Sequence, residues 1–383
     1  MPQDGILMQR ALILAEATAG LASPNPMVGC IIARGSQILG EGTHLYDKLD
    51  HAEIVALKQA SARGHDVRGA TAYVTLEPCS HHGRTGPCAD ALIAAGISRC
   101  IVATADPNPQ VRGQGLARLR DAGIDVAVGL FQARARRLND GFALSITQHR
   151  PFVTLKAALS VDGHLAPPPS IRTPNQPFWL SGPESRVEVQ EMRHRSDVIL
   201  TGIGTILADD PALTDRTGLP RRRALMRVVL DTHLRTPVSA KVVQTARKSR
   251  LKDLWIFCGT AVDPLRRAAL EKLGVKVTPV RGNGGLDLVE VLAHLHAEHF
   301  LNVLLEAGSA VNGAFLQADL VDDVVLFYSE TELGEGAVAF AEGTSGPFAL
   351  EERLRNVHKR AFGSDVCVSG MLHDPWPKAS DFS

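Results

Sequence analysis

The sequence predicts an α/β protein with two domains, and three observations support this. The chain has 383 residues, which is enough for two domains of ordinary size. Short apolar runs of strand length alternate with segments of helical periodicity, and this alternation occurs in two blocks. Residues 138–150, between the blocks, are polar and charged enough for a boundary, although their apolar residues suggest that they pack. We therefore expect one domain over residues 1–146 and a second over residues 147–383.

In the first block, the pattern predicts a helix followed by alternating strands and helices. The expected helices cover residues 5–19, 52–60, 88–95 and 114–121, and the expected strands cover residues 28–33, 72–76, 100–104 and 125–128. This order is typical of a sheet layered against helices.

The second block again predicts strands separated by helices. The expected strands cover residues 152–160, 197–201, 227–231, 254–257, 275–280, 302–306 and 324–328. Two of them run into glycine turns, T-G-I-G at residues 201–204 and E-A-G-S at residues 306–309.

Each glycine turn brings small residues to the start of an expected helix, where backbone N–H groups can hold a phosphate. Neither turn is a full G-x-G-x-x-G fingerprint, so a plain strand-to-helix connection is the alternative for either one. The nearby charges of Asp209, Asp210, Glu306, Arg193 and Arg216 favour a site for a large anionic ligand.

The first block carries a metal-site motif, with H-A-E at residues 51–53, L-E-P-C at residues 76–79 and a further cysteine at position 88. One imidazole and two thiolates, from His51, Cys79 and Cys88, are typical of a zinc hydrolytic deaminase in which water takes the fourth position. Zinc lowers the pKa of its bound water to roughly 7, and Glu53 would carry the proton to the departing amine. Because residues i and i+2 do not face each other within a helix, we expect His51 and Glu53 at a first turn, and Cys79 on a loop after a strand.

The spacing of the two cysteines leaves two other interpretations open. A generic deaminase signature ends in P-C-x-x-C, whereas here residues 80–87 separate the cysteines. His81 or His82, within this insertion, could replace a ligand. A purely structural zinc site is the second alternative, but such a site normally has four Cys or His ligands, and Glu53 beside His51 favours catalysis.

The composition favours a cytoplasmic metabolic enzyme. The formal net charge is zero and the basic runs at residues 134–137 and 221–223 are short, so no nucleic-acid partner is expected. No apolar stretch reaches the roughly 18 residues of a membrane span, and the first residues lack the basic region of a signal peptide. Apolar, strand-like runs contain the remaining cysteines, which we expect to be reduced core thiols: Cys30, Cys100, Cys258 and Cys367.

Several longer motifs occur in order along nearly the whole chain. They are P-N-P-M-V-G-C at residues 24–30, L-E-P-C-S-H-H-G-R-T-G-P-C at 76–88, D-P-N-P at 106–109, L-N-D-G-F at 138–142, T-L-K-A-A-L-S-V-D-G at 154–163 and T-I-L-A-D-D-P-A-L-T at 205–214. Together with H-A-E at 51–53, this set resembles the bifunctional pyrimidine deaminase/reductase family of riboflavin biosynthesis.

The resemblance implies a zinc-dependent, cytidine-deaminase-like domain of three layers at the N-terminus. This domain would hydrolyse the 2-amino group of 2,5-diamino-6-ribosylamino-4(3H)-pyrimidinone 5′-phosphate. The resemblance also implies a C-terminal α/β domain similar to dihydrofolate reductase, in which NADPH reduces the ribosyl group of the product, 5-amino-6-(5-phosphoribosylamino)uracil, to ribityl. The expected partners are small phosphorylated pyrimidines and other copies of the chain, with neither nucleic acid nor membrane involved.

Site residues follow from the motifs that match the family. The resemblance places the zinc ligands at His51, Cys79 and Cys88, the proton shuttle at Glu53, pyrimidine contacts at Asn25 and His44, and a contact near the ribose phosphate at Arg84. In the second domain it implies substrate contacts at Lys156, Arg193, Leu213, Arg216 and Glu306. It implies NADPH contacts at Ala158, Trp179, Thr205, Asp209, Gly308, Ser309, Ala310, Val311, Asn312, Gly313 and Ala314. For Lys156, a solvated charge on a strand is the alternative.

Some segments depart from the family pattern. The family usually has a short S-G-E-S-x-W stretch whose serine contacts the substrate phosphate, whereas residues 162–179 are longer and carry Pro177 at the serine position. Y-S-E-T-E-L-G at residues 328–334 replaces the usual Y-x-A-P-x-L-L-G, and Gly86 replaces a proline in the zinc loop. A deaminase with an inactive or binding-only C-terminal half is therefore an alternative, and a nucleic-acid deaminase is a third interpretation that the neutral charge disfavours.

Overall fold

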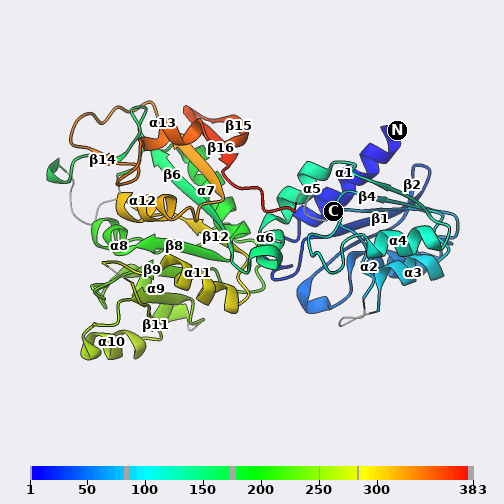
Figure 1. The fold of residues 1–383 in the computed structure, drawn as a ribbon, viewed down its shortest axis with the longest axis horizontal. Coiled ribbons are helices and arrows are strands. Elements are labelled where there is room, and N and C mark those ends of the chain that lie inside the picture. Colours follow the sequence, from blue (N-terminus) through cyan, green and yellow to red (C-terminus); the bar gives the residue numbers. More distant parts are fainter. Residues whose placement is uncertain (1, 82–85, 172–177, 250, 283, 378–383) are drawn as a thin grey trace. The chain divides into compact units, whose positions relative to one another are not determined.

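A computed structural model of the chain describes residues 2–81, 86–171, 178–249, 251–282 and 284–377 (Figure 1). The chain divides into two compact units. Unit 1 comprises Met1–His149, Pro220–Arg222 and Pro375–Ser383, and unit 2 comprises Arg150–Leu219 and Arg223–Asp374. Over the described ranges, no helix is both long enough and apolar enough to cross a membrane.

Unit 1 is built on one sheet with helices on both of its faces. Its helices are α1 (Pro2–Glu16), α2 (Ala52–Ala62), α3 (Cys88–Ala94), α4 (Gln114–Asp121), α5 (Gln132–Leu138) and α6 (Asp140–Gln148), with the 3-10 turn η1 (Tyr46–Lys48). Its strands are β1 (Gly29–Arg34), β2 (Gln37–Thr43), β3 (Thr71–Val74), β4 (Arg99–Val102) and β5 (Asp125–Val128), in the order β2-β1-β3-β4-β5. β3, β4 and β5 are parallel, and β1 is antiparallel to both of its neighbours.

Successive side chains of a strand point to opposite faces, and in unit 1 each face meets a different layer of helices. In β1, Cys30 and Ile32 pack in the core formed with α2, α3 and α4, whereas Ile31 and Ala33 pack in the core formed with α1 and α5. Helices therefore cover both faces of this sheet (Figure 1), which confirms the predicted three-layer arrangement.

The sequence analysis did not predict β2, and two glycines explain why. Gly40 and Gly42 interrupt its apolar pattern, which weakens the strand signal. A Cβ atom at Gly40 would lie 2.2 Å from the carbonyl oxygen of Ala56, and one at Gly42 would lie 2.2 Å from that of Ala52. The glycines thus allow α2 to pack directly on the backbone of β2, which fixes the start of α2 against the sheet.

Unit 2 contains a larger sheet, and every strand predicted for this part of the chain is present within a few residues of its predicted position. The strands are β6 (Phe152–Leu159), β7 (His164–Ala166), β8 (Val198–Gly202), β9 (Met226–Leu230), β10 (Leu254–Cys258), β11 (Lys276–Pro279), β12 (Asn302–Leu305), β13 (Asp323–Tyr328), β14 (Val338–Ala339), β15 (Arg355–Phe362) and β16 (Asp365–Met371). The helices are α7 (Pro183–Arg195), α8 (Ile203–Asp209), α9 (Lys241–Ser249), α10 (Pro264–Glu271), α11 (Leu288–Ala297), α12 (Ser309–Gln317) and α13 (Gly346–Glu351), with the 3-10 turn η2 (Pro169–Ile171).

In the part of the chain that the structure describes, the main sheet of unit 2 has the order β11-β10-β9-β8-β12-β6-β13-β16-β15, and β7 pairs separately with β14. The run from β11 to β13 is parallel, whereas β16 and β15 are antiparallel to their neighbours. One core packs α11, α12 and α13 on the sheet, and another packs α8, α9 and α10. Both faces of the central parallel strands are therefore covered, as is usual for parallel sheets.

The four cysteines outside the metal motif, Cys30, Cys100, Cys258 and Cys367, are free and buried. This confirms the prediction of core thiols.

Candidate active sites

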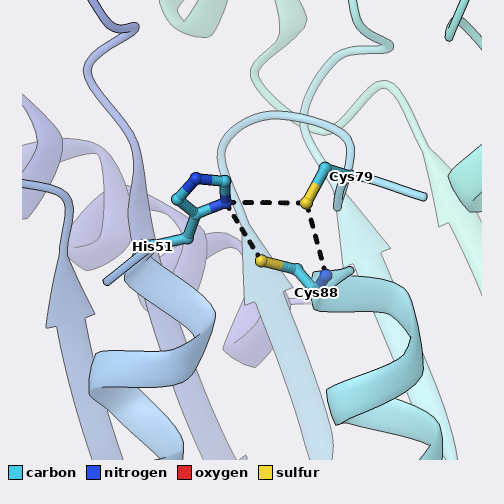
Figure 2. Close-up of side chains that lie close together, drawn as sticks. All are labelled: His51, Cys79 and Cys88. Atoms are coloured by element: carbon cyan, nitrogen blue, oxygen red, sulfur yellow. Dashed lines mark hydrogen bonds between the residues drawn. The ribbon is translucent and has the colours of Figure 1, made fainter. Parts of the chain in front are cut away.

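The structure of unit 1 brings His51, Cys79 and Cys88 together. His51 is the N-cap of α2, Cys88 is the first residue of α3, and Cys79 lies on the loop after β3. The Nδ1 atom of His51 lies 3.2 Å from the Sγ of Cys88 and 3.5 Å from the Sγ of Cys79, and the N–H of Cys88 donates to the Sγ of Cys79 at 3.3 Å (Figure 2). One ligand atom from each residue lies within 4.8 Å of the others.

The residues of this group fit a zinc ion. A nitrogen ligand and two sulfur ligands are those that zinc prefers, and three protein ligands leave the fourth tetrahedral position for water. Hydrogen bonds from Cys88 and His51 lower the pKa of the Cys79 thiol, which favours the thiolate that a metal requires. His81, which could have replaced a ligand, is not part of the group, and His82 lies outside the described residues.

Glu53 lies in the first turn of α2, two residues after His51, as the sequence predicted. Its side chain is buried, and burial raises the pKa of its carboxyl group to about 7, although the neighbouring His51 opposes this effect. A carboxyl group with a pKa near neutrality can both accept and return a proton, which is the requirement for a proton shuttle.

Asn25 and His44 lie next to the metal group. The Nδ2 of Asn25 is 2.8 Å from the Nε2 of His44, and the Nδ1 of His44 is 2.9 Å from the carbonyl oxygen of Asp50. These partners require Nδ1–H to donate to Asp50 and Nε2 to accept from Asn25, so the ring is neutral; burial also lowers the pKa of His44. The rings of His44 and His51 are 5.4 Å apart, edge to face. Arg84, the expected contact near the ribose phosphate, lies outside the described residues.

The sequence analysis gave no role to Glu77, which precedes the P-C pair of the motif. Its buried carboxylate accepts hydrogen bonds from backbone N–H groups at the start of α4 and in the D-P-N-P turn: Asp106 at 3.1 Å, Gly113 at 2.9 Å, Gly115 at 3.0 Å and Leu116 at 3.3 Å. A Cβ atom at Gly115 would lie 2.0 Å from the carbonyl oxygen of Pro78, so only glycine allows this approach. Glu77 and Gly115 thereby attach the loop that carries Cys79 to α4.

In unit 2, the structure brings together Lys156 on β6, Arg193 on α7 and Glu306 after β12. Arg193 donates from Nε to Oε1 of Glu306 at 2.7 Å and from Nη2 to Oε2 at 3.0 Å, and the Nζ of Lys156 is 3.7 Å from Oε2. Burial alone would raise the pKa of Glu306, but the charges of Arg193 and Lys156 outweigh it and lower this pKa to about 2. Burial lowers the pKa of Lys156. The Lys156 side chain is only 13% exposed, so it is part of a partly buried charge cluster, and the alternative of a solvated strand charge is wrong.

The other expected substrate residues lie on the loop after α8. Arg193 donates from Nη1 to the carbonyl oxygen of Thr214 at 3.1 Å, so the loop is bonded to the charge cluster next to the buried Leu213. Arg216, further along the loop, has an exposed side chain, and its backbone N–H donates to Oε1 of Gln190 at 2.9 Å.

The two glycine turns lie side by side. Gly202 is the N-cap of α8 and Gly308 is the N-cap of α12, which confirms the predicted helix starts. A Cβ atom at Gly202 would lie 2.6 Å from Cγ2 of Val311, and one at Gly308 would lie 3.8 Å from Oγ1 of Thr205. Thr205 is therefore near the start of α12, and Asp209 ends α8.

Within residues 308–314, the first turn of α12 differs in its hydrogen bonding from the residues that follow it. Ser309, Ala310 and Val311 have N–H groups in the first turn, where helix geometry gives them no partner within the helix. The side chain of Asn312 is buried and donates to the carbonyl oxygen of Phe340 at 3.0 Å, and a Cβ atom at Gly313 would lie 2.1 Å from the carbonyl oxygen of Glu342. Asn312 and Gly313 therefore pack against residues 340–342. The amide donors that suit a phosphate are those of the first turn.

The remaining expected NADPH contacts are more dispersed. Ala158 lies on β6 in register with Phe327 of β13. Trp179 is 60% exposed and its ring lies 5.2 Å from the guanidinium carbon of Arg186, and no described contact joins it to the glycine turns.

Comparisons with known proteins cover both units. Residues 151–368 match the family described as the RibD C-terminal domain, and residues 1–104 match the cytidine and deoxycytidylate deaminase zinc-binding region. The chain is 41% identical over 347 residues to the riboflavin biosynthesis protein RibD of Escherichia coli (strain K12), with 88% of this chain and 90% of that protein covered. It is 36% identical over 367 residues to RibD of Aquifex aeolicus (strain VF5), with 95% and 97% covered.

Solved structures agree with these relatives. Acinetobacter baumannii RibD aligns with a TM-score of 0.79 and 34% identity, covering 97% of this chain and 99% of that one. A Thermotoga maritima protein described as a diaminohydroxyphosphoribosylaminopyrimidine deaminase/5-amino-6-(5-phosphoribosylamino)uracil reductase aligns with a TM-score of 0.81 and 31% identity, covering 97% and 99%. The chain therefore belongs to the RibD family of riboflavin biosynthesis proteins.

Proposed function

We propose that the chain catalyses two successive reactions of riboflavin biosynthesis, with the deaminase over residues 1–146 and the reductase over residues 147–383. The first is the hydrolytic deamination of 2,5-diamino-6-ribosylamino-4(3H)-pyrimidinone 5′-phosphate, and the second is the NADPH-dependent reduction of the deaminated product. The observation that carries the proposal is the pair of separate sites: His51, Cys79 and Cys88 beside Glu53 in unit 1, and Lys156 with Arg193 and Glu306 in unit 2.

In the deaminase, His51, Cys79 and Cys88 would hold zinc, which supplies an activated water when it is bound. Asn25 and the neutral His44 orient the pyrimidine so that the carbon bearing the 2-amino group faces this water. Glu53 takes a proton from the water and transfers it to the amino nitrogen, so that a C–O bond forms, the C–N bond breaks and ammonia leaves.

In the reductase, Thr205, Asp209 and the first turn of α12 would hold NADPH, which when bound would supply a hydride for C1′ of the ribosyl group and be oxidised to NADP⁺. The ring oxygen must gain a proton as its bond to C1′ breaks, and we assign the delivery of this proton to Lys156. Burial lowers the pKa of this ammonium, so it loses a proton more readily than an exposed lysine. Glu306 and Arg193 orient the sugar, and the amide donors of Ser309, Ala310 and Val311 suit the cofactor's phosphates.

The cellular setting is also part of the proposal. Buried free thiols in both units suit a reducing compartment, so we place the enzyme in the cytoplasm. We expect a homo-oligomer, which light scattering on the purified chain would test.

The proposal predicts a fixed stoichiometry. The diaminopyrimidinone substrate should release one equivalent of ammonia without NADPH, and addition of NADPH should then oxidise one equivalent of cofactor. Release of ammonia with no oxidation of NADPH would support the alternative, a deaminase with a binding-only C-terminal half. The departure at Pro177 favours that alternative, and it lies outside the described residues.

A further inference from the structure

Asn139 occupies the junction of two helices in unit 1, at the end of α5 and the start of α6. Asparagine at the start of a helix usually accepts a hydrogen bond from an N–H group of that helix. The amide of Asn139 is used differently, because both of its ends are bonded to the backbone of Met27. The N–H of Met27 donates to Oδ1 of Asn139 at 2.7 Å, and Nδ2 of Asn139 donates to the carbonyl oxygen of Met27 at 3.0 Å. One side chain thus holds one backbone residue, 112 positions away in the sequence, through a donor and an acceptor.

Met27 lies in the middle of the segment that contacts His44. At one end of this segment, Nδ2 of Asn25 is 2.8 Å from Nε2 of His44. At the other end, the N–H of His44 donates to the carbonyl oxygen of Val28 at 3.2 Å. The residue that Asn139 holds is therefore placed between the two contacts that set Asn25 against His44.

The start of α6 is itself fixed in the core of unit 1. Asn139 is only 3% exposed, and Asp140, the next residue, is also buried. The Oδ1 of Asp140 accepts from Nε1 of Trp376 at 2.8 Å, and its Oδ2 accepts from Nη1 of Arg137 at 3.1 Å. Trp376 is buried in the same core as Ala143 of α6. Asn139 thus projects from a rigid element, which positions a site more precisely than a loop does.

We propose that Asn139 is a positioning residue of the deaminase, which acts through Met27 to hold Asn25 and His44 in place for the pyrimidine. The inference rests on the proposed deaminase function. Without the amide of Asn139, two backbone groups of Met27 lose their partners, which is unfavourable away from water. The segment then shifts to satisfy these groups, and Asn25 moves with it. The metal ligands lie on other elements, so the loss falls on substrate binding and not on zinc.

The test uses the full-length, zinc-loaded chain and the change Asn139→Leu, which keeps the approximate size of the side chain and removes its donor and acceptor. KM and kcat for ammonia release from the diaminopyrimidinone are measured together with bound zinc. We expect kcat/KM to fall by roughly 10- to 100-fold, mainly through a higher KM, since a displacement of about 1 Å can cost this much. Zinc content should be unchanged. A lower kcat with an unaltered KM would mean that Asn139 serves folding alone, and would overturn the proposal.

Three further variants complete the design. Asn139→Asp keeps the acceptor for the N–H of Met27 but cannot donate to its carbonyl oxygen, so it should also raise KM, and it tests the proposal even if Asn139→Leu folds poorly. In an Asn25→Ala background, the further change Asn139→Asp should have much less effect than in the unaltered chain, because both changes remove the same contact with the pyrimidine. Thr147→Val, which removes a side-chain hydrogen bond to Ala143 in the same helix, is the matched control and should behave as the unaltered chain.

The outcomes separate this inference from the function on which it rests. An unaltered KM in Asn139→Asp, or fully additive effects of the changes at Asn25 and Asn139, would overturn the positioning role. Absence of ammonia release by the unaltered, zinc-loaded chain would instead overturn the deaminase function itself.

Discussion

Arg193 donates two hydrogen bonds to Glu306, at 2.7 and 3.0 Å, from a helix 113 residues away in the sequence. Each of the two side chains is only 13% exposed, and a charge largely shielded from solvent that loses its partner is unfavourable. The geometry therefore makes Glu306 the residue on which the arrangement of the whole reductase cluster depends, because Arg193 is hydrogen-bonded to it and Lys156 forms an ion pair with it at 3.7 Å.

We expect Glu306→Gln to impair the reductase selectively. The amide cannot balance the two neighbouring cations, so the sugar should be oriented poorly and NADPH oxidation should fall by about tenfold or more. Ammonia release by unit 1 should be unchanged. Glu290→Gln, on the surface of α11, is the control, and equal loss of both activities in Glu306→Gln would indicate general misfolding instead.

The same carboxylate should make stability depend on pH. Its pKa is about 2 in the folded chain, below the ordinary value of 4.5, so its contribution is complete above pH 4.5 and is lost as the pH falls toward 2. The free energy of unfolding should decrease by on the order of 3 kcal/mol over that range through this group alone. Urea unfolding at pH 5 and at pH 3 measures this effect. Between these two pH values, the free energy of unfolding should decrease less for Glu306→Gln than for the unaltered chain. Equal decreases would show that Glu306 does not cause the pH dependence.

Glu53→Gln should abolish most of the deamination while zinc is retained. The amide has the shape of the carboxyl group but cannot accept a proton, and loss of a general acid-base group typically costs about 10²- to 10⁴-fold. Ammonia release and bound zinc are measured on the same samples. Glu41→Gln, which changes a surface ion pair with Arg10, serves as the control. Near-normal ammonia release from Glu53→Gln would show that another group transfers the proton.

Cys79→Ser and Cys88→Ser should each lose zinc, because a serine hydroxyl is a far weaker zinc ligand than a thiolate. Metal content after dialysis is the measurement. Cys100→Ser provides a matched control in the same unit, since Cys100 is buried outside the metal group. Full zinc content in Cys79→Ser or Cys88→Ser would show that the replaced cysteine is not a zinc ligand.

Glu77→Gln should weaken zinc binding although Glu77 is not a ligand. The Oε2 atom of Glu77 accepts hydrogen bonds from the backbone N–H groups of Asp106 and Gly113. An amide NH₂ in the same position is itself a donor, so it could accept neither hydrogen bond. The loop before Cys79 would then loosen, and changes to groups that support metal ligands typically cost about 10- to 100-fold in affinity. Competition with a chelator measures this effect, with Glu16→Gln on the surface as the control; an unaltered affinity would mean that the loop is held by other contacts.

The metal group could be predicted from the sequence because its residues lie in short, recognisable motifs. H-A-E and L-E-P-C combine ligand types and spacing that few other sites share, and the start of α2 could be derived from the i and i+2 positions of His51 and Glu53. The role of Glu77 could not be predicted in this way, because its partners lie at positions 106–116 and are backbone groups that leave no side-chain signal.

The fold was predictable where burial imposes a pattern. The central strands of unit 2 are buried on both faces and appear as continuous apolar runs, such as Leu254–Cys258. β15 was missed because nearly all of its side chains are exposed, so Arg355–Phe362 shows neither an apolar run nor an alternation. The cluster of Lys156, Arg193 and Glu306 draws on three separate elements; the charge pattern near the glycine turns grouped Arg193 with Glu306, and only the family resemblance added Lys156.

The most direct test of two independent sites in one chain uses Glu53→Gln supplied with the deaminated product, 5-amino-6-(5-phosphoribosylamino)uracil. We expect this variant to oxidise NADPH at the rate of the unaltered chain, because the reductase residues are contributed by unit 2, while it releases almost no ammonia from the diaminopyrimidinone. Failure of the variant to oxidise NADPH, under conditions in which the unaltered chain does so, would contradict the division of the two reactions between the two units.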